Sequence, residues 1–83
     1  MYVHVTAMAV NQYKISTPEG TYFQSYNVLI AKIPSDRREI ILDSRYWNYS
    51  VTTGKYRNQF LGEGIAETRK KIKSGEYILA DLN

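Results

Sequence analysis

The sequence contains no cysteine, one histidine and only two prolines. Without cysteine the chain has no disulfide, no thiol nucleophile and no thiolate ligand for a metal, which fits a reducing compartment. His4 is the single histidine, so a histidine-pair metal site and a Ser–His pair with a spare histidine are both absent. These absences exclude the commonest active sites of small enzymes. We predict a protein that is not an enzyme and needs no cofactor and no metal.

The sequence also lacks a long hydrophobic run. No apolar segment approaches the ~20 residues that span a bilayer, and residues 1–6 lack the charged start and apolar stretch of a signal peptide. We therefore expect a cytoplasmic protein without a membrane partner. The 83 residues, 43% of them hydrophobic, are enough for one core. We expect residues 1–83 to form a single domain.

Strand signals dominate the first half of the chain and return at its end. They occupy residues 2–9, 13–17, 22–33, 39–43 and 77–80. The stretch 22–33 is the longest apolar and aromatic run, so we place it centrally in the sheet, with Tyr26–Ala31 buried on both faces. The stretch 2–9 would be an edge strand, which could pair two copies into a homodimer.

Two short helices are expected between the last two strands. The hydroxyls of Ser50, Thr52 and Thr53 can accept the free N–H groups where the first helix begins. Gly62 and Gly64 then separate the two helices. The element order is ββββααβ, an α+β domain with an antiparallel sheet of four to five strands.

The side chains of each helix are assigned to a face by their spacing. In the first helix, Lys55, Arg57 and Asn58 fall largely on the side opposite the aromatic residues. In the second helix, about 65–74, we expect Ile65, Ala66 and Ile72 to point inward. Glu67 and Lys71 are four residues apart in the favourable order for an ion pair, and the Gly75 that follows can end this helix in the left-handed conformation.

The positive charge belongs to the second half of the chain. Residues 1–44 hold four basic and four acidic residues, whereas residues 45–83 hold seven and four, which accounts for the whole net charge of +3. A local excess of this kind favours acidic partners, either nucleic acid or an acidic protein surface. A solvated helix surface explains the same composition without any partner.

Aromatic residues are frequent, with eight tyrosines, and five of the aromatic rings lie between residues 46 and 60 among basic side chains. This combination is typical of single-strand binders and also of protein-interface hot spots. We expect Trp47 and Phe60 to serve the core, because a small domain needs its large rings for burial. The candidate partner-binding residues are Arg45, Tyr46, Tyr49, Lys55, Arg57, Asn58, Arg69, Lys70 and Lys73.

Three carboxylates form an alternative site. Asp36, Glu39 and Asp43 cluster around one turn and could bind a divalent cation through oxygen ligands, as a metal-dependent enzyme would require. Arg37 and Arg38 lie among them, and a solvated hairpin end explains the same residues. We therefore predict no metal here.

Part of the sequence resembles a known group of proteins. The stretches 25–31, 47–61 and 72–77, together with the ending Asp81-Leu82-Asn83, are similar to a family of small uncharacterised proteins from phages and mobile elements. The segment Tyr49-Ser50-Val51-Thr52-Thr53 is the most specific part. The resemblance covers residues 25–83 and transfers no catalytic or binding residue. It implies a phage or mobile-element setting, in which small proteins often inhibit host defence, as anti-CRISPR proteins do.

Two hypotheses about function follow. In the first, the chain is a non-enzymatic accessory protein that inhibits a bacterial defence complex, such as a CRISPR–Cas effector, in the host cytoplasm by contact with its protein or ribonucleoprotein surface. In the second, it is a small basic regulator that binds nucleic acid. Salt dependence separates the two, because phosphate contacts release counterions.

Overall fold

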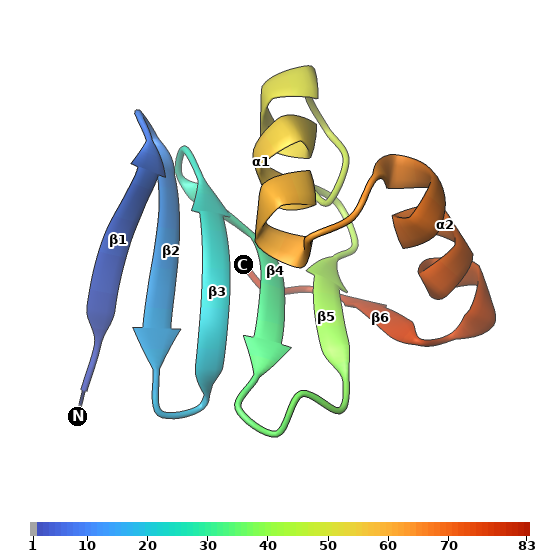
Figure 1. The fold of residues 1–83 in the computed structure, drawn as a ribbon, viewed down its shortest axis with the longest axis horizontal. Coiled ribbons are helices and arrows are strands. Elements are labelled where there is room, and N and C mark those ends of the chain that lie inside the picture. The colour runs from blue at the N-terminus through green and yellow to red at the C-terminus, as the bar shows by residue number, and fades with distance from the viewer. Residues whose placement is uncertain (1) are drawn as a thin grey trace.

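The computed structural model describes residues 2–83 and has the α+β architecture that the sequence predicts (Figure 1). Its elements are β1 (His4–Ala9), β2 (Gln12–Thr17), β3 (Gly20–Ser25), β4 (Val28–Pro34), β5 (Ile40–Asp43), α1 (Val51–Leu61), α2 (Ile65–Ser74) and β6 (Tyr77–Ala80). The six strands lie in chain order across one sheet. Neighbouring strands are antiparallel up to β5, whereas β5 and β6 are parallel because the two helices carry the chain back to the same end.

The stretch 22–33 differs from its prediction. It is a hairpin made by β3 and β4, which raises the strand count to six, although both strands do lie at the centre of the sheet. The chain reverses at Tyr26, which is exposed and has φ of 56°, a conformation unfavourable for bulky side chains. A hydrogen bond of 2.7 Å from the Tyr26 N–H to the Asn11 carbonyl holds this turn. The reversal contains neither glycine nor proline, so the sequence gives no turn signal there and the apolar run is read as one strand.

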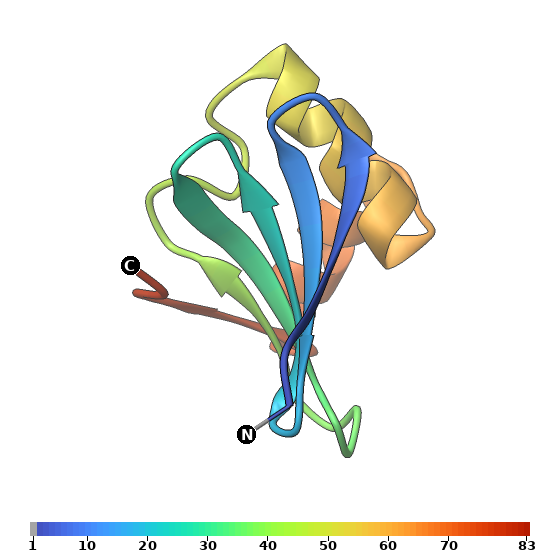
Figure 2. The same ribbon diagram turned by 90° about the vertical axis from the view of Figure 1, so that its left-hand side faces the viewer.

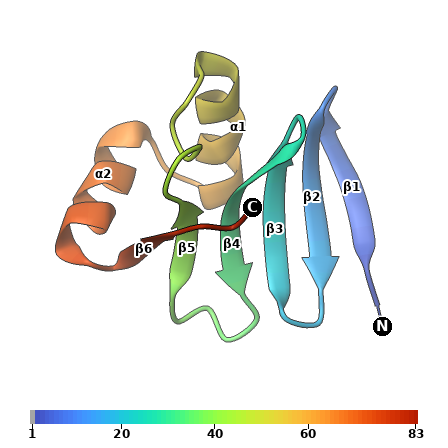
Figure 3. The ribbon, with the colours of Figure 1, turned by 180° about the vertical axis from the view of Figure 1, so that it is seen from behind.

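Both helices cover one face of the sheet, and the C-terminal segment crosses the other face (Figures 2 and 3). α1 contacts β2 and β3, and α2 packs against β6. On the far face the Asn83 side chain accepts from the Leu29 N–H at 2.8 Å and donates to the Leu29 carbonyl at 3.0 Å. β1 is an edge strand with mostly exposed side chains. Within residues 2–83, no helix is long and apolar enough to cross a membrane.

The apolar core lies between the sheet and the helices. Its buried members are Phe23, Ile30, Ala31, Leu42 and Tyr77. Trp47 and Phe60 pack against this cluster, as predicted, and the Phe60 ring stacks on Phe23 with the centroids 5.7 Å apart. The rings of Trp47 and Phe60 therefore stabilise the fold.

A second set of buried side chains is polar and lies beneath and within α1. This polar layer consists of Gln12, Ser25, Thr53 and Arg57. The Ser25 and Thr53 hydroxyls are 2.8 Å apart, and Gln12 is the cross-strand neighbour of Ser25. The amide oxygen and nitrogen of Gln12 are buried and have no hydrogen-bond partner among residues 2–83. α1 thus packs partly on polar groups. A hydrophobic pattern in the sequence cannot predict this polar contact.

The helix ends follow the sequence prediction. The Ser50 hydroxyl accepts from the Thr53 N–H at 3.1 Å at the start of α1. Gly62 and Gly75 end the two helices with φ of 73° and 85°, a conformation that glycine adopts at low cost.

The packing of α2 differs from the prediction at two positions. Ala66 is exposed, and the buried residue of the helix is Thr68. Lys71 pairs at 2.7 Å with Glu63, which precedes the helix, instead of with Glu67. The prediction of a Glu67–Lys71 pair used only the four-residue spacing within one helix. The turn between the helices places Glu63 closer to Lys71.

Candidate functional site

An open groove of about 800 Å³ lies between α1, the loop before it and the first half of α2. We call it the α1–α2 groove. It is lined by Asn48, Tyr49, Ser50, Val51, Gly54, Lys55, Arg57, Asn58, Gln59, Ile65 and Arg69. The fold therefore brings together five residues that the sequence analysis proposed for partner binding, although their chain positions span 21 residues: Tyr49, Lys55, Arg57, Asn58 and Arg69.

The other four proposed residues lie outside the groove lining. Arg45, Lys70 and Lys73 are exposed, the last two on α2. Tyr46 is half-buried against the core, and its ring meets the Tyr49 ring edge-on with centroids 5.4 Å apart. Tyr46 therefore supports Tyr49, whose side chain is 45% exposed.

Arg57 corrects the expected orientation of α1. The sequence spacing assigned it to the outer face, but its exposed fraction is 1%. The guanidinium donates to the Trp47 carbonyl at 2.8 Å, to Asn48 Oδ1 at 3.0 Å and to Asn58 Oδ1 at 2.9 Å. Its carbon also lies 5.4 Å from the centroid of the Trp47 ring, within the range of a cation–π contact. These partners explain how the fold holds a buried cation.

The charge of Arg57 acts on the groove from below. Burial lowers the pKa of Arg57, and the positive charge of Arg69 lowers it further, while Glu63 opposes both effects. Arg69 is exposed and makes no ion pair with residues 2–83. Two positive charges that act on each other favour an anion near both of them.

Two asparagine side chains, Asn48 and Asn58, also line the groove. Each uses its oxygen to accept from Arg57, which leaves its NH2 group as a donor at the groove. Among the lining residues there is no aspartate or glutamate. The groove therefore offers cations and N–H donors, the chemistry that binds carboxylate or phosphate oxygens.

Six of the eleven lining residues were not proposed from the sequence, and two of them, Asn48 and Gly54, lie beside the Arg57 guanidinium. The role of Asn48 could not be predicted, because it depends on the hydrogen bond from Arg57 that orients its amide. Gly54 did carry a signal, because a glycine inside a predicted helix costs stability relative to alanine and calls for a packing or functional reason. In the structure Gly54 is buried beside the guanidinium of Arg57.

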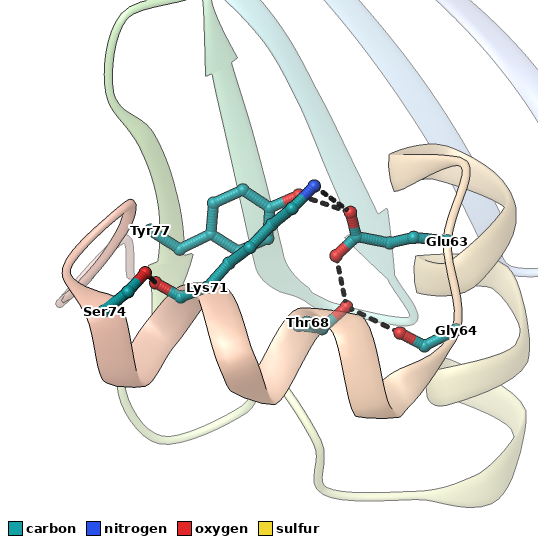
Figure 4. A network of polar contacts seen from close by, with 6 residues as sticks. All are labelled: Glu63, Gly64, Thr68, Lys71, Ser74 and Tyr77. Atoms are coloured by element: carbon teal, nitrogen blue, oxygen red, sulfur yellow. Dashed lines mark hydrogen bonds and ion pairs between the residues drawn. The ribbon is translucent and has the colours of Figure 1, made fainter.

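A hydrogen-bonded cluster around Glu63 fixes α2 relative to the sheet (Figure 4). The Glu63 carboxylate accepts from Thr68 Oγ1 at 2.6 Å, from Lys71 Nζ at 2.7 Å and from the Tyr77 hydroxyl at 2.8 Å. Thr68 precedes Arg69, so the same contacts that hold this turn of α2 also position Arg69 at the groove.

The titration of the cluster reflects these contacts. Burial raises the pKa of Glu63, but the hydrogen bonds from Lys71, Thr68 and Tyr77 outweigh it and hold that pKa below its ordinary value. Burial and the bond to Glu63 raise the pKa of the Tyr77 hydroxyl to about 12. The hydrogen bond to Glu63 also raises the pKa of Lys71, so at neutral pH the pair is ionised.

Two of the carboxylates proposed for a cation, Asp36 and Asp43, accept hydrogen bonds from backbone N–H groups. Asp36 accepts from the Arg38 N–H at 3.0 Å. Asp43 is buried and accepts from the N–H groups of Arg45 and Tyr46 and, on its other oxygen, from Leu82. In the described part of the chain, no three histidine, cysteine or acidic side chains come together as a metal site.

The chain was compared with known proteins. The family model described as "Family of unknown function (DUF8033)" matches residues 1–77. The matched range includes both helices and every residue of the α1–α2 groove. No curated protein and no solved structure matches the chain.

Proposed function

We propose, for a chain that belongs to the DUF8033 family, that it is a non-enzymatic binding protein whose α1–α2 groove holds an anionic partner. One observation carries this proposal: two arginines, a lysine and two asparagine amides line the groove without any carboxylate. The hydroxyl of Ser50, which also lines the groove, accepts a helix N–H as the cap of α1. Its groups therefore suit binding better than bond cleavage.

We further propose that the partner is a bacterial defence complex of the CRISPR–Cas effector class and that the chain is its inhibitor. The groove would hold the guide RNA or an acidic protein surface of the complex, since a basic chain cannot imitate the phosphate backbone of DNA. The similarity of residues 25–83 to small phage and mobile-element proteins supports this setting, and the host cytoplasm is the corresponding location.

The first experiment measures phage plating on bacteria that carry one defined CRISPR–Cas system and express the protein. Expression is expected to raise plating on the defended strain and to leave it unchanged on a strain without the system. Arg69→Gln should abolish the effect, because it removes an exposed groove cation. Arg38→Gln removes the same charge from the distant β4–β5 turn and should retain it. Unchanged plating across a panel of defence systems would refute the inhibitor proposal.

A pull-down of the purified effector with the tagged protein then locates the contact. If guide RNA is the contact, ribonuclease treatment of the effector before the pull-down should prevent its capture. If the contact is an acidic protein surface, the treated effector should still be captured. Absence of binding to any effector that the plating assay identifies would contradict direct inhibition.

The second candidate function, a small regulator that binds nucleic acid, is favoured by the mutual repulsion of Arg57 and Arg69. It predicts an affinity for oligonucleotides that falls with salt, with a log–log slope of about −0.7 for every phosphate contacted on a single strand. A slope near zero, measured by fluorescence anisotropy between low and moderate salt, would remove this candidate.

A further inference from the structure

The guanidinium of Arg57 has donors that the protein does not use. A guanidinium carries five N–H groups, and Trp47, Asn48 and Asn58 accept three hydrogen bonds from Arg57. The Nε atom is buried and has no hydrogen-bond partner within residues 2–83, and Nη2 makes a single bond. An unpaired buried donor is costly. A ligand oxygen that enters the groove beside Gly54 would meet Nη2, whose second N–H is free, next to the unpaired Nε.

Gly54 leaves room for that oxygen beside the guanidinium. A Cβ atom at this position would lie 3.6 Å from Nη2 and 3.7 Å from Nη1 of Arg57, at ordinary contact distance. Any other residue would therefore place its side chain against the guanidinium, on the wall of the groove. Glycine is unfavourable inside a helix, so its effect here is to keep this space open.

The opposite wall supplies further attraction for an anion. Arg69 reaches the groove from the first turns of α2, and Ile65 at the start of that helix also lines it. The N-cap of α2 is Gly64, which makes no side-chain hydrogen bond to the free N–H groups of the first turn. The partial positive charge of this helix end adds to the two guanidiniums, and Glu67 in the first turn opposes it.

We propose that the α1–α2 groove binds one phosphate group of a single-stranded nucleic acid, with Arg57 and Arg69 as its cationic partners and Tyr49 as the platform for a neighbouring base. This inference deepens the proposed function and rests on its anionic partner. A phosphate offers several acceptor oxygens to the clustered donors. The exposed Tyr49 ring, supported edge-on by Tyr46, is suited to stack on a base of any sequence.

The direct test is a two-dimensional ¹H–¹⁵N NMR titration of the protein with inorganic phosphate and with thymidine monophosphate. The Arg57 Nε–H gives its own signal, which should shift as phosphate is added, together with backbone signals of residues 48–58 and 64–69. Shifts confined to other parts of the molecule, or an unmoved Arg57 Nε–H signal, would overturn the site.

Gly54→Ala is the decisive variant, because it leaves every charge in place. The added methyl group fits at contact distance and improves helix propensity, so the melting temperature should stay equal or rise. Phosphate and oligonucleotide binding should weaken about tenfold, the loss expected for one charged hydrogen bond. Thr52→Ala is the control, because Thr52 is exposed on the same helix, lies outside the groove lining and is also replaced by a better helix former. Unchanged binding by Gly54→Ala would contradict the proposal.

The source of the phosphate is tested with a labelled ten-nucleotide single strand. A strand-phosphate site predicts that this oligonucleotide binds at least about tenfold more tightly than thymidine monophosphate and that Tyr49→Ala weakens the strand but not inorganic phosphate. Equal affinity for the strand and the mononucleotide would point to a free phosphate ligand and overturn the commitment to nucleic acid.

The site and the proposed inhibitor function can fail separately. If Gly54→Ala binds phosphate like the wild type while plating still responds to Arg69→Gln, the phosphate site is wrong and the inhibitor proposal stands. If phosphate binds as described while no defence system is affected, the inhibitor proposal is wrong and the site stands.

Discussion

The interior beneath the helices is built from two kinds of chemistry. Around Phe23 and Leu42 it is apolar, and the rings of Trp47 and Phe60 close over it. Beneath and within the first turns of α1 it is polar, with the Gln12 amide, paired hydroxyls and a buried guanidinium. The apolar part follows from hydrophobic burial. The polar part is a poor source of stability, and it lies directly under the groove.

The difference separates the residues that stabilise the fold from the residues that are available to bind a partner. The strands and the packed rings hold the fold together, whereas α1, the loop before it and Arg69 of α2 present charge and donors at the groove. Residues that lower stability are expected where a protein binds or reacts. Substitutions in the two regions should therefore differ in size and even in sign.

The largest effect is expected in the apolar part. Phe23→Ala should lower the free energy of unfolding by about 3–5 kcal/mol, because it removes a fully buried ring and leaves a cavity. Urea denaturation followed by circular dichroism measures the loss. Val10→Ala, at an exposed position, should change stability by less than about 0.5 kcal/mol. A loss from Phe23→Ala no larger than that of the control would place the core elsewhere.

The Glu63 cluster holds α2 against the apolar part through Tyr77, and Glu63→Gln should lower the free energy of unfolding by about 1–2 kcal/mol at pH 7. The folded-state pKa of Glu63 lies below its ordinary value of 4.5. The carboxylate therefore contributes fully above that value, and its contribution is lost as the pH falls through the folded pKa. The wild type and the variant should converge in acid. Equal differences at pH 7 and at pH 3 would contradict the role of the charge, and Glu67→Gln is the matched control.

In the polar layer, Arg57→Lys should cost about 1–2 kcal/mol although it keeps the charge. An ammonium cannot serve in one plane the three acceptors that the guanidinium reaches, so buried acceptors lose their partners. Thermal and urea unfolding would measure the change, with Arg38→Lys as the exposed control. If both variants are equally stable, the contacts of Arg57 are not what orders this layer.

The smallest expected effect has the opposite sign. Gln12→Met should stabilise the domain by about 1 kcal/mol, since it replaces an unpaired buried amide with an apolar group of similar size. Gln59→Met is the same change at an exposed position and should be near neutral. Clear destabilisation by Gln12→Met would show that the amide has a partner, such as a bound water, and that the layer is better satisfied than its contacts indicate.

Much of the fold could be predicted from the residues. The strand signals of residues 2–9 and 13–17 and the helix ends at Gly62 and Gly75 are local, and local signals suffice for strands and caps. The reversal at Tyr26 could not be predicted, because a contact with Asn11 holds it and no turn residue marks it. The parallel pairing of β6 likewise depends on where the helices return the chain.

The candidate site was predicted as a region more than as a geometry. The charge excess and the aromatic residues pointed to the segment between Arg45 and Lys73, and five of the nine proposed residues share the groove. The burial of Arg57 was missed, because helix spacing assigned its face from the apolar residues Tyr56 and Phe60. Arg57 is buried instead by the loop before α1, where the Trp47 carbonyl and the Asn48 amide accept its hydrogen bonds, and this tertiary contact is not encoded in the helix spacing.

The central claim is that the α1–α2 groove binds the phosphates of an anionic strand. Its most direct test is the affinity of a labelled single-stranded oligonucleotide for Arg69→Gln and Arg38→Gln, measured by anisotropy at low salt. The two variants lose the same charge from different places. We predict that Arg69→Gln binds about tenfold more weakly than the wild type, whereas Arg38→Gln stays within about twofold. Equal affinities for the two variants would show that the groove is not the binding site.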